Sequence, residues 1–143
     1  MSSVVVDASV AVCWFTREAG TPAANQLLRE GAHLVAPSLI LAEFANTLWK
    51  KERRGGMSVD QAEIALREIH RFVPAIVEMG KLILPAFALA RASQHSVYDC
   101  LYVALASERG VDFVTLDRNL VAAFRGAPEG RRVLELAQWL GKG

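Results

Sequence analysis

Val4-Val5-Val6-Asp7-Ala8-Ser9, close to the start of the chain, is a run of β-branched residues that stops on a carboxylate. Three consecutive valines favour an extended strand that is buried on both faces, as in the middle of a parallel sheet. Asp7 then lies at the carboxyl end of that strand. Ligands and catalytic groups gather at this edge of open α/β sheets, because the loops that leave the strands diverge there. Asp7 is therefore the first candidate for a functional residue.

The segments after this stretch alternate between strand-like and helix-like patterns. Strands are expected at residues 33–36, 74–78, 112–116 and, briefly, 132–134. Helices are expected at residues 10–15, 22–30, 39–54, 59–71, 81–94 (bent or restarted at Pro85), 97–109 and 118–124, with a short last helix through Trp139. The expected N-caps are Ser9, Thr21, Ser58 and Ser96, and Gly110 is the expected C′ residue. Strands separated by helices, without two-residue hairpin turns, predict an α/β fold in which helices cover both faces of a central parallel β-sheet.

The composition limits the class of protein. A chain of 143 residues without a linker-like segment fits a single domain. Its 16 Lys and Arg against 15 Asp and Glu give a net charge of +1, so the chain lacks the strongly basic balance of many nucleic-acid-binding domains. Any basic patch must be local. The hydrophobic share of 52% and the mean hydropathy of +0.24 predict a large core or a buried interface between copies.

No segment predicts a membrane protein or a secreted one. The longest apolar run within the helical segments, residues 82–90, is too short to span a bilayer and contains Pro85. The first residues lack the basic segment of a secretory signal. Cys13 and Cys100 suit a reducing compartment, where they would be small buried thiols. We therefore expect a cytoplasmic protein.

A second candidate acid, Asp99, lies in the first turn of the expected helix 97–109. That segment is apolar almost all round, which predicts a buried helix. An ionised carboxylate in such surroundings is costly unless another group compensates its charge. The structural alternative is that Asp99 only completes a capping box with Ser96.

Glu43 and Asp117 complete the set of candidate acids. Glu43 is the one charged residue between Leu39 and Trp49, in the helix that follows the second strand. Asp117 follows the strand 112–116 as Asp7 follows the first strand. Each has an ordinary alternative, because Glu43 can lie on a solvated helix face and Asp117 can be a helix N-cap.

The predicted fold brings all four acids to one crevice, because each lies at or just beyond the carboxyl end of a strand or in the first turns of a helix. Like charges in one pocket repel, so such a group persists only if protons or cations compensate it. Oxygen ligands without His or Cys at metal-binding spacing suit Mg²⁺ or Mn²⁺ better than Zn²⁺. Carboxylate-held Mg²⁺ typically serves phosphate chemistry. The residues thus predict a metal-dependent phosphoryl site and name no substrate.

Four motifs carry a family resemblance. They are Val5-Val6-Asp7-Ala8-Ser9, Leu41-Ala42-Glu43-Phe44-Ala45-Asn46, Val97-Tyr98-Asp99-Cys100-Leu101-Tyr102-Val103-Ala104-Leu105-Ala106 and Val114-Thr115-Leu116-Asp117. With these motifs in this order, nearly the whole chain resembles PIN-domain ribonucleases, and among them the VapC-type toxins of toxin–antitoxin pairs. The resemblance implies a PIN-like three-layer sandwich and an endoribonuclease that depends on Mg²⁺ or Mn²⁺ and cuts RNA with water activated by the metal.

The resemblance also implies roles for particular residues. Asp7, Glu43, Asp99 and Asp117 would be the catalytic, metal-binding acids, with Asp117 the one most able to act through water. Ser9, Asn46 and Thr115 would orient the acids or the water through hydrogen bonds. Their structural alternatives are a helix cap, a solvated amide and a strand hydroxyl. The candidates for contacts with the RNA backbone are Arg17, Lys50, Lys51, Arg53, Arg54 and Arg118.

The resemblance further implies partners. VapC-like proteins generally form homodimers and are silenced by a cognate VapB-type antitoxin. The apolar surplus fits both partnerships, with Trp14, Phe15, Trp49 and helix 58–71 as candidate contacts and packing within the monomer as the alternative for each.

Other classes of function fit the sequence less well. A haloacid-dehalogenase-type phosphatase needs a second Asp where Ser9 stands, and a dinucleotide-binding fold needs a glycine-rich turn after the first strand. The serious alternative is a PIN-like binding module with little catalysis, against which the presence of all four acids argues.

Overall fold

Five parallel strands form the centre of the protein in a computed structural model that describes residues 2–142. The strands are β1 (Ser3–Val6), β2 (His33–Pro37), β3 (Ala75–Val77), β4 (Asp112–Thr115) and β5 (Val133–Glu135). Their order in the sheet is β3-β2-β1-β4-β5, so β1 is the central strand. Val5 pairs with Val35 on one side and with Phe113 on the other. The predicted α/β fold with a parallel sheet is confirmed.

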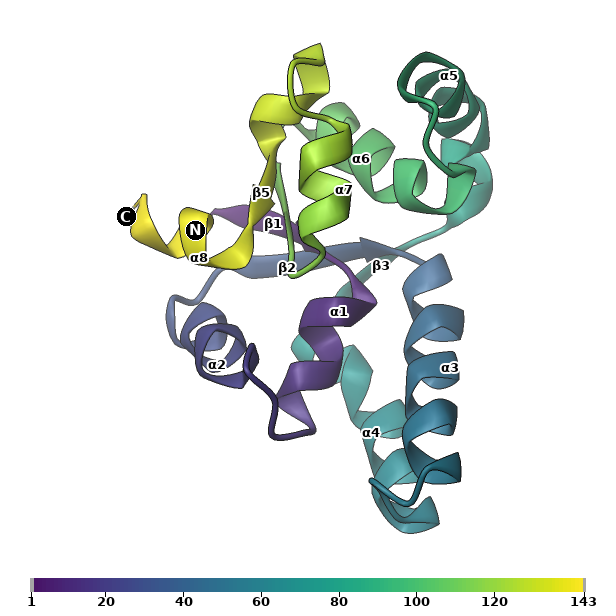
Figure 1. Ribbon diagram of the computed structural model, residues 1–143, viewed down its shortest axis with the longest axis vertical. Coiled ribbons are helices and arrows are strands. Elements are labelled where there is room, and N and C mark those ends of the chain that lie inside the picture. The colour runs from purple at the N-terminus through teal and green to yellow at the C-terminus, as the bar shows by residue number, and fades with distance from the viewer. Residues whose placement is uncertain (1, 143) are drawn as a thin grey trace.

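Helices cover both faces of this sheet. They are α1 (Ala8–Ala11), α2 (Thr21–Arg29), α3 (Leu39–Arg53), α4 (Val59–Phe72), α5 (Ile83–Ser93), α6 (Val97–Arg109), α7 (Arg118–Ala123) and α8 (Leu136–Gly141), and the short 3₁₀ helices are Val12–Trp14, Met79–Leu82 and Pro128–Arg132. Figure 1 shows α1 to α4 on one side of the sheet and α5, α6 and α7 on the other, with α3 and α4 running side by side away from the sheet. The result is a three-layer arrangement.

The start of α1 differs from the expectation. Ser9 is not the N-cap; Asp7 is, and its carboxylate accepts hydrogen bonds from the backbone N–H groups of Ser9 and Val10. The cap moves because the Asp7 backbone is extended and its short side chain reaches the free amides of the first turn. The segment continues as the 3₁₀ helix Val12–Trp14 rather than as one helix to Phe15.

Two other helix starts are also corrected. Thr21 is the first residue of α2 and not its cap, because its hydroxyl donates to the Thr16 carbonyl and accepts from the Glu18 N–H, which ties the preceding loop together. Of the bend and the restart expected at Pro85, the structure shows a restart, two residues earlier: the 3₁₀ helix Met79–Leu82 ends and α5 begins at Ile83. Pro85 lies in the first turn of α5, where its missing N–H costs no helical hydrogen bond.

The remaining helix boundaries agree with the expected signals. Ser58 and Gln61 form the capping box of α4, and the Ser96 hydroxyl accepts from the Asp99 N–H at the start of α6. Gly110 ends α6 with a φ of 64°, in the left-handed region that favours glycine. Each of these signals depends on residues within one helical turn, which is why the sequence was sufficient to predict them.

The hydrophobic core extends through the sheet into both helical layers. The three valines of β1 are at most 1% exposed, and Cys100 to Ala106 of α6 are all buried, as the apolar pattern predicted. Cys13 and Cys100 are buried free thiols. Trp14 stacks on Phe72 within the monomer, so packing inside the chain accounts for its burial. Within residues 2–142, no helix has the length and apolarity that crossing a bilayer requires.

Candidate active site

Asp7 is a buried carboxylate at the carboxyl end of the central strand. Only 8% of it is exposed. The Ser9 hydroxyl donates to Oδ1 at 2.6 Å, and the Thr115 hydroxyl donates to Oδ2 at 2.6 Å. Ser9 lies in α1, directly after β1, and Thr115 ends the neighbouring β4, so each carboxylate oxygen accepts from a hydroxyl at the carboxyl edge of the sheet. This arrangement fixes the orientation of the carboxylate.

Burial makes the charge of Asp7 expensive. Desolvation raises the pKa of Asp7 from 3.8 to about 6, and the negative charge of Glu43 adds to the rise, against the opposing hydrogen bonds from Ser9, Thr115 and Val10. The effect of Glu43 also shows that the two acids share one electrostatic environment. Because desolvation destabilises the ionised form of Asp7, a cation that binds beside it at neutral pH would stabilise that charge.

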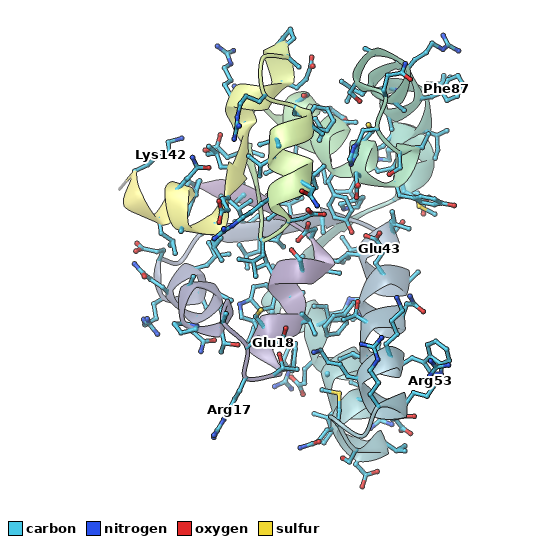
Figure 2. The ribbon with its side chains drawn as sticks, viewed as in Figure 1. Arg17, Glu18, Glu43, Arg53, Phe87 and Lys142 are labelled. Atoms are coloured by element: carbon cyan, nitrogen blue, oxygen red, sulfur yellow. The ribbon has the colours of Figure 1, made fainter. Side chains whose placement is uncertain are left out.

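Glu43 lies in the second turn of α3 and is turned toward α6. Figure 2 shows it at the sheet end of α3, with Arg53 at the far end. Oε1 accepts a hydrogen bond of 2.6 Å from the Tyr102 hydroxyl. Desolvation and the negative charge of Asp99 raise the pKa of Glu43, and the Tyr102 hydrogen bond partly offsets that rise. The solvated helix face, the alternative considered for Glu43, is not what the structure shows.

Asp99 makes two different contacts in the first turn of α6. Its N–H donates to the Ser96 hydroxyl at 3.2 Å, which is the expected cap. Its Oδ2 lies 2.7 Å from Nε2 of His95. The His95 ring is partly buried and packs edge-on near Phe124. The backbone N–H of Asp99 therefore makes the capping contact, and the carboxylate makes a separate contact with another side chain.

Asp117 is linked to Asp7 through Thr115, but its own carboxylate points elsewhere. The Asp117 N–H donates to the Thr115 hydroxyl at 3.0 Å, and that hydroxyl in turn donates to Asp7. Oδ1 of Asp117 accepts from the N–H groups of Asn119 and Leu120, so the helix-cap alternative holds for this residue. Asp117 is exposed, which leaves its second oxygen open to solvent.

The structure brings together most of the candidate residues. The charge of Glu43 contributes to the raised pKa of Asp7, the charge of Asp99 contributes to the raised pKa of Glu43, and Ser9 and Thr115 contact Asp7. Asn46 is exposed on α3 and takes part in none of the side-chain hydrogen bonds found within residues 2–142. The roles of all seven residues in catalysis stay predictions.

The donor set fits a hard divalent cation in type and charge. None of the ion pairs within residues 2–142 includes Asp7, Glu43 or Asp117, so no lysine or arginine compensates their charge. In the same residues, no three His, Cys, Asp or Glu side chains already stand as one set of ligands. Glu43 contacts Tyr102 through Oε1 and Asp99 contacts His95 through Oδ2, so among residues 2–142 the second oxygen of each carboxylate makes no side-chain hydrogen bond.

Sequence reasoning missed two side chains of the site, Tyr102 and His95. The signal for Tyr102 was its spacing from Asp99, because residues three positions apart lie on one face of a helix. His95 precedes Asp99 by four positions but lies before the N-cap Ser96, outside α6, so helical spacing does not predict its contact. Neither spacing indicates which acid is contacted, since Tyr102 reaches Glu43 on another helix.

The fold and the acids at the carboxyl edge of the sheet define a class of protein. A model of the PIN domain family, described as "PIN domain", matches residues 4–126. That range includes all four candidate acids, β2, β3 and β4, and all of β1 except its first residue.

Relatives narrow the class. Ribonuclease VapC3 of Pyrobaculum aerophilum is 36% identical over 123 residues, which are 85% of this chain and 94% of that protein. The chain therefore belongs to the PIN-domain family, among its VapC ribonucleases. The resemblance inferred from the four motifs is confirmed.

Solved structures share the fold at lower identity. A crystal structure of a protein from Pyrobaculum aerophilum has a TM-score of 0.69 and 22% identity, covering 99% of this chain and 96% of that one. A toxin–antitoxin complex from Klebsiella pneumoniae has a TM-score of 0.63 and 15% identity, covering 94% of this chain and 98% of that one. Both likenesses support the PIN-like fold.

Proposed function

We propose that this chain acts as a single PIN domain over residues 1–143, a cytoplasmic metal-dependent endoribonuclease and the toxin of a toxin–antitoxin pair. The observation that carries the proposal is Asp7, a buried carboxylate whose two oxygens are held by Ser9 and Thr115 while Glu43 adds further negative charge. Membership of the VapC ribonucleases supports the choice of RNA as substrate. An acid with only a structural role gains nothing from a neighbour such as Glu43, whose negative charge makes its own ionisation more costly.

In this proposal Asp7, Glu43, Asp99 and Asp117 hold Mg²⁺ or Mn²⁺. The bound cation would lower the pKa of a water molecule and stabilise the negative charge that develops on the phosphate. Ser9 and Thr115 keep both Asp7 oxygens in one orientation, and Tyr102 holds one oxygen of Glu43. His95 is the one histidine in contact with a candidate acid among residues 2–142, through Asp99. The arrangement favours hydrolysis of a phosphodiester that lies along this edge of the sheet.

The basic side chains at the C-terminal end of α3 form the surface on which we expect the RNA backbone to bind. Among the candidate cations, Lys51 pairs with Glu18 and Arg118 with Glu135. The Arg53 guanidinium lies 4.9 Å from the centre of the Trp49 ring, and Trp49 is 51% exposed. Exposed aromatic rings beside cations suit unpaired nucleotides, because bases stack on the ring while phosphates pair with the charges. We place the RNA along this exposed side of α3, leading toward Glu43.

The partners fit two other surfaces. A cavity of about 630 Å³ lies between the segment after α1 and the ends of α3 and α4, lined by Trp14, Arg17, Glu18, Lys51, Met57 and Gln61 among others. We assign it to a segment of the cognate antitoxin, because its mixed apolar and charged lining suits a peptide. On α5, the side chains of Ile83, Leu84 and Phe87 are exposed, and Figure 2 shows Phe87 on the outer side of this helix. We assign this apolar face to the homodimer.

The test is cleavage of a panel of structured RNAs by the purified chain, free of any antitoxin, with Mn²⁺, with Mg²⁺ and with EDTA. Cleavage that needs the cation and is lost in Asp7→Asn and Asp99→Asn is the expected result. A folded wild type that binds Mn²⁺ and RNA but cuts nothing would favour the binding-module alternative. A wild type that binds no cation would refute the four-acid site.

A further inference from the structure

We propose that Tyr102 is the positioning residue that presents Glu43 to the cation. The inference rests on the proposed function, since it concerns the same acidic site, and it assigns a role to a residue outside the four acids and their predicted supports. The claim is that the Tyr102 hydroxyl binds one Glu43 oxygen and leaves the other directed at the site.

Tyr102 is rigid enough for this role. Its side chain is fully buried in α6, and its ring stacks on Phe113 of β4 with ring centres 5.4 Å apart and an interplanar angle of 15°. Phe113 is itself fully buried and pairs with Val5 of the central strand. The hydroxyl therefore has a fixed place relative to the sheet that carries Asp7.

Glu43 depends on that hydroxyl for its orientation. It is only partly buried, and the bond of 2.6 Å from Tyr102 is the one side-chain hydrogen bond that its carboxylate makes among residues 2–142. Without it, a glutamate retains several rotamers, and ordering them costs free energy when a ligand binds. The hydrogen bond from Tyr102 already orders the Glu43 side chain in the folded protein, so cation binding does not include this cost.

The position of Tyr102 also connects two acids that come from different helices. Glu43 belongs to α3, whereas Tyr102 lies one turn after Asp99 on α6. The hydrogen bond thus ties Glu43 to the helix that carries Asp99, and the negative charge of Asp99 is felt at Glu43. One tyrosine thus links Glu43 to the helix that carries Asp99.

An ordinary structural reading must be distinguished from this one. A buried tyrosine hydroxyl needs a hydrogen-bond partner, so Glu43 could simply satisfy Tyr102. On that reading, removing the hydroxyl changes stability but not the affinity for a cation. On ours, it weakens cation binding even in a correctly folded variant.

The experiment measures Mn²⁺ affinity without RNA, by calorimetry, for the wild type, Tyr102→Phe and Tyr98→Phe. Tyr98 is the matched control, since it is on the same helix and 64% exposed. We expect Tyr102→Phe to weaken Mn²⁺ binding roughly tenfold, the size of one hydrogen bond to a charged group. Tyr98→Phe should leave it unchanged. Cleavage by Tyr102→Phe should recover when Mn²⁺ is raised by the same factor.

A cycle with Glu43→Ala tests the route of the effect. If Tyr102 acts through Glu43, Tyr102→Phe causes no further loss of Mn²⁺ affinity in the Glu43→Ala background. An equal loss in both backgrounds, or unchanged affinity in Tyr102→Phe itself, overturns the proposal.

Two crystal structures distinguish a failure of the Tyr102 proposal from a failure of the proposed function. In metal-free Tyr102→Phe, Glu43 should leave its wild-type conformation, and an unchanged Glu43 overturns the role of Tyr102 even if the wild type binds no Mn²⁺. If Tyr102→Phe does not fold, the wild type with Mn²⁺ decides. Glu43 should then bind Mn²⁺ with one oxygen and Tyr102 with the other, and loss of the Tyr102 contact overturns the proposal.

Discussion

Thr115 donates a hydrogen bond of 2.6 Å to Asp7 although the two residues are 108 positions apart in the chain. The bond joins β4 to β1 at the edge where the acids lie, and the same hydroxyl accepts the N–H of Asp117. One oxygen atom thus contributes both to the orientation of Asp7 and to the path of the chain after β4. This makes Thr115 the sharpest place to perturb the site without removing an acid.

Thr115→Val should lower the free energy of unfolding by about 2 kcal/mol, because it strips a buried hydroxyl that bonds a carboxylate and leaves the Asp117 N–H without its acceptor. Urea denaturation measures this. Thr115→Ser keeps the hydroxyl and should retain RNA cleavage, whereas Thr115→Val should lose most of it. Equal cleavage by the two variants would show that the hydroxyl does not orient Asp7.

The stability of the metal-free protein should depend on pH through Asp7. Its folded pKa of about 6 exceeds the value of 3.8, so the folded state binds this proton more tightly. The resulting stabilisation is complete below pH 3.8, falls as pH rises toward about 6, and above that the ionised form is disfavoured by about 3 kcal/mol. Asp7→Asn removes this dependence.

Denaturation of both proteins in EDTA across this pH range isolates the effect, since other groups titrate in both and cancel in the difference. Relative to the wild type, Asp7→Asn should gain stability as pH rises from about 4 to about 6 and hold that gain above. A difference that stays flat with pH would mean that Asp7 is not protonated more readily in the folded state.

Mn²⁺ should stabilise the fold because it binds the acids only in their folded arrangement. At a Mn²⁺ concentration a hundred times its Kd, the gain should be about 2.7 kcal/mol. Thermal unfolding with Mn²⁺ and with EDTA measures it. Asp7→Asn and Asp99→Asn should lose the gain, while Glu63→Gln, an exposed acid on α4, should keep it.

The basic end of α3 should contribute to RNA affinity through charge. Replacing Lys50 and Arg53 together by alanine should lower the magnitude of the slope of log affinity against log salt by about 1.4, since each single-strand contact contributes about 0.7. Binding is measured in EDTA so that no RNA is cut. Arg67 and Arg71, exposed on α4, form the control pair. An equal change in the control pair would argue against a defined path along α3.

The apolar face of α5 should hold the dimer together. Leu84 is 81% exposed, so Leu84→Asp leaves the monomer fold intact while placing a charge where we expect the second copy. Its mass in solution should fall to that of a monomer, whereas Ile64→Asp on α4 should not change it. A wild type that is monomeric at micromolar concentration would refute the dimer, and dissociation by Ile64→Asp alone would move the interface to α4.

Features that depend on residues close in the sequence could be predicted, whereas contacts between distant residues could not. The strand before Asp7, the capping box at Ser58 and the end of α6 at Gly110 depend on neighbours within a few residues, and the sequence was enough to find them. Asp7 as the cap of α1 was missed because the helix begins two residues earlier than expected, so that the first free amides are those of Ser9 and Val10 and the Asp7 carboxylate accepts from them. The pairing of Tyr102 with Glu43 joins residues 59 positions apart, and no local pattern encodes the partner of a buried hydroxyl.

Asp7 is the N-cap of α1 and, in the proposed function, the central acid of the site, and this has a consequence for misfolding. Side chains alternate between the faces of a strand, so a slip of β1 by one residue would turn its valines and Asp7 to the wrong sides together. The same slip would remove the cap of α1 and separate Asp7 from Thr115. A chain that folds incorrectly here therefore cannot retain a misdirected nuclease activity, because correct pairing of the sheet and assembly of the acidic site are the same event.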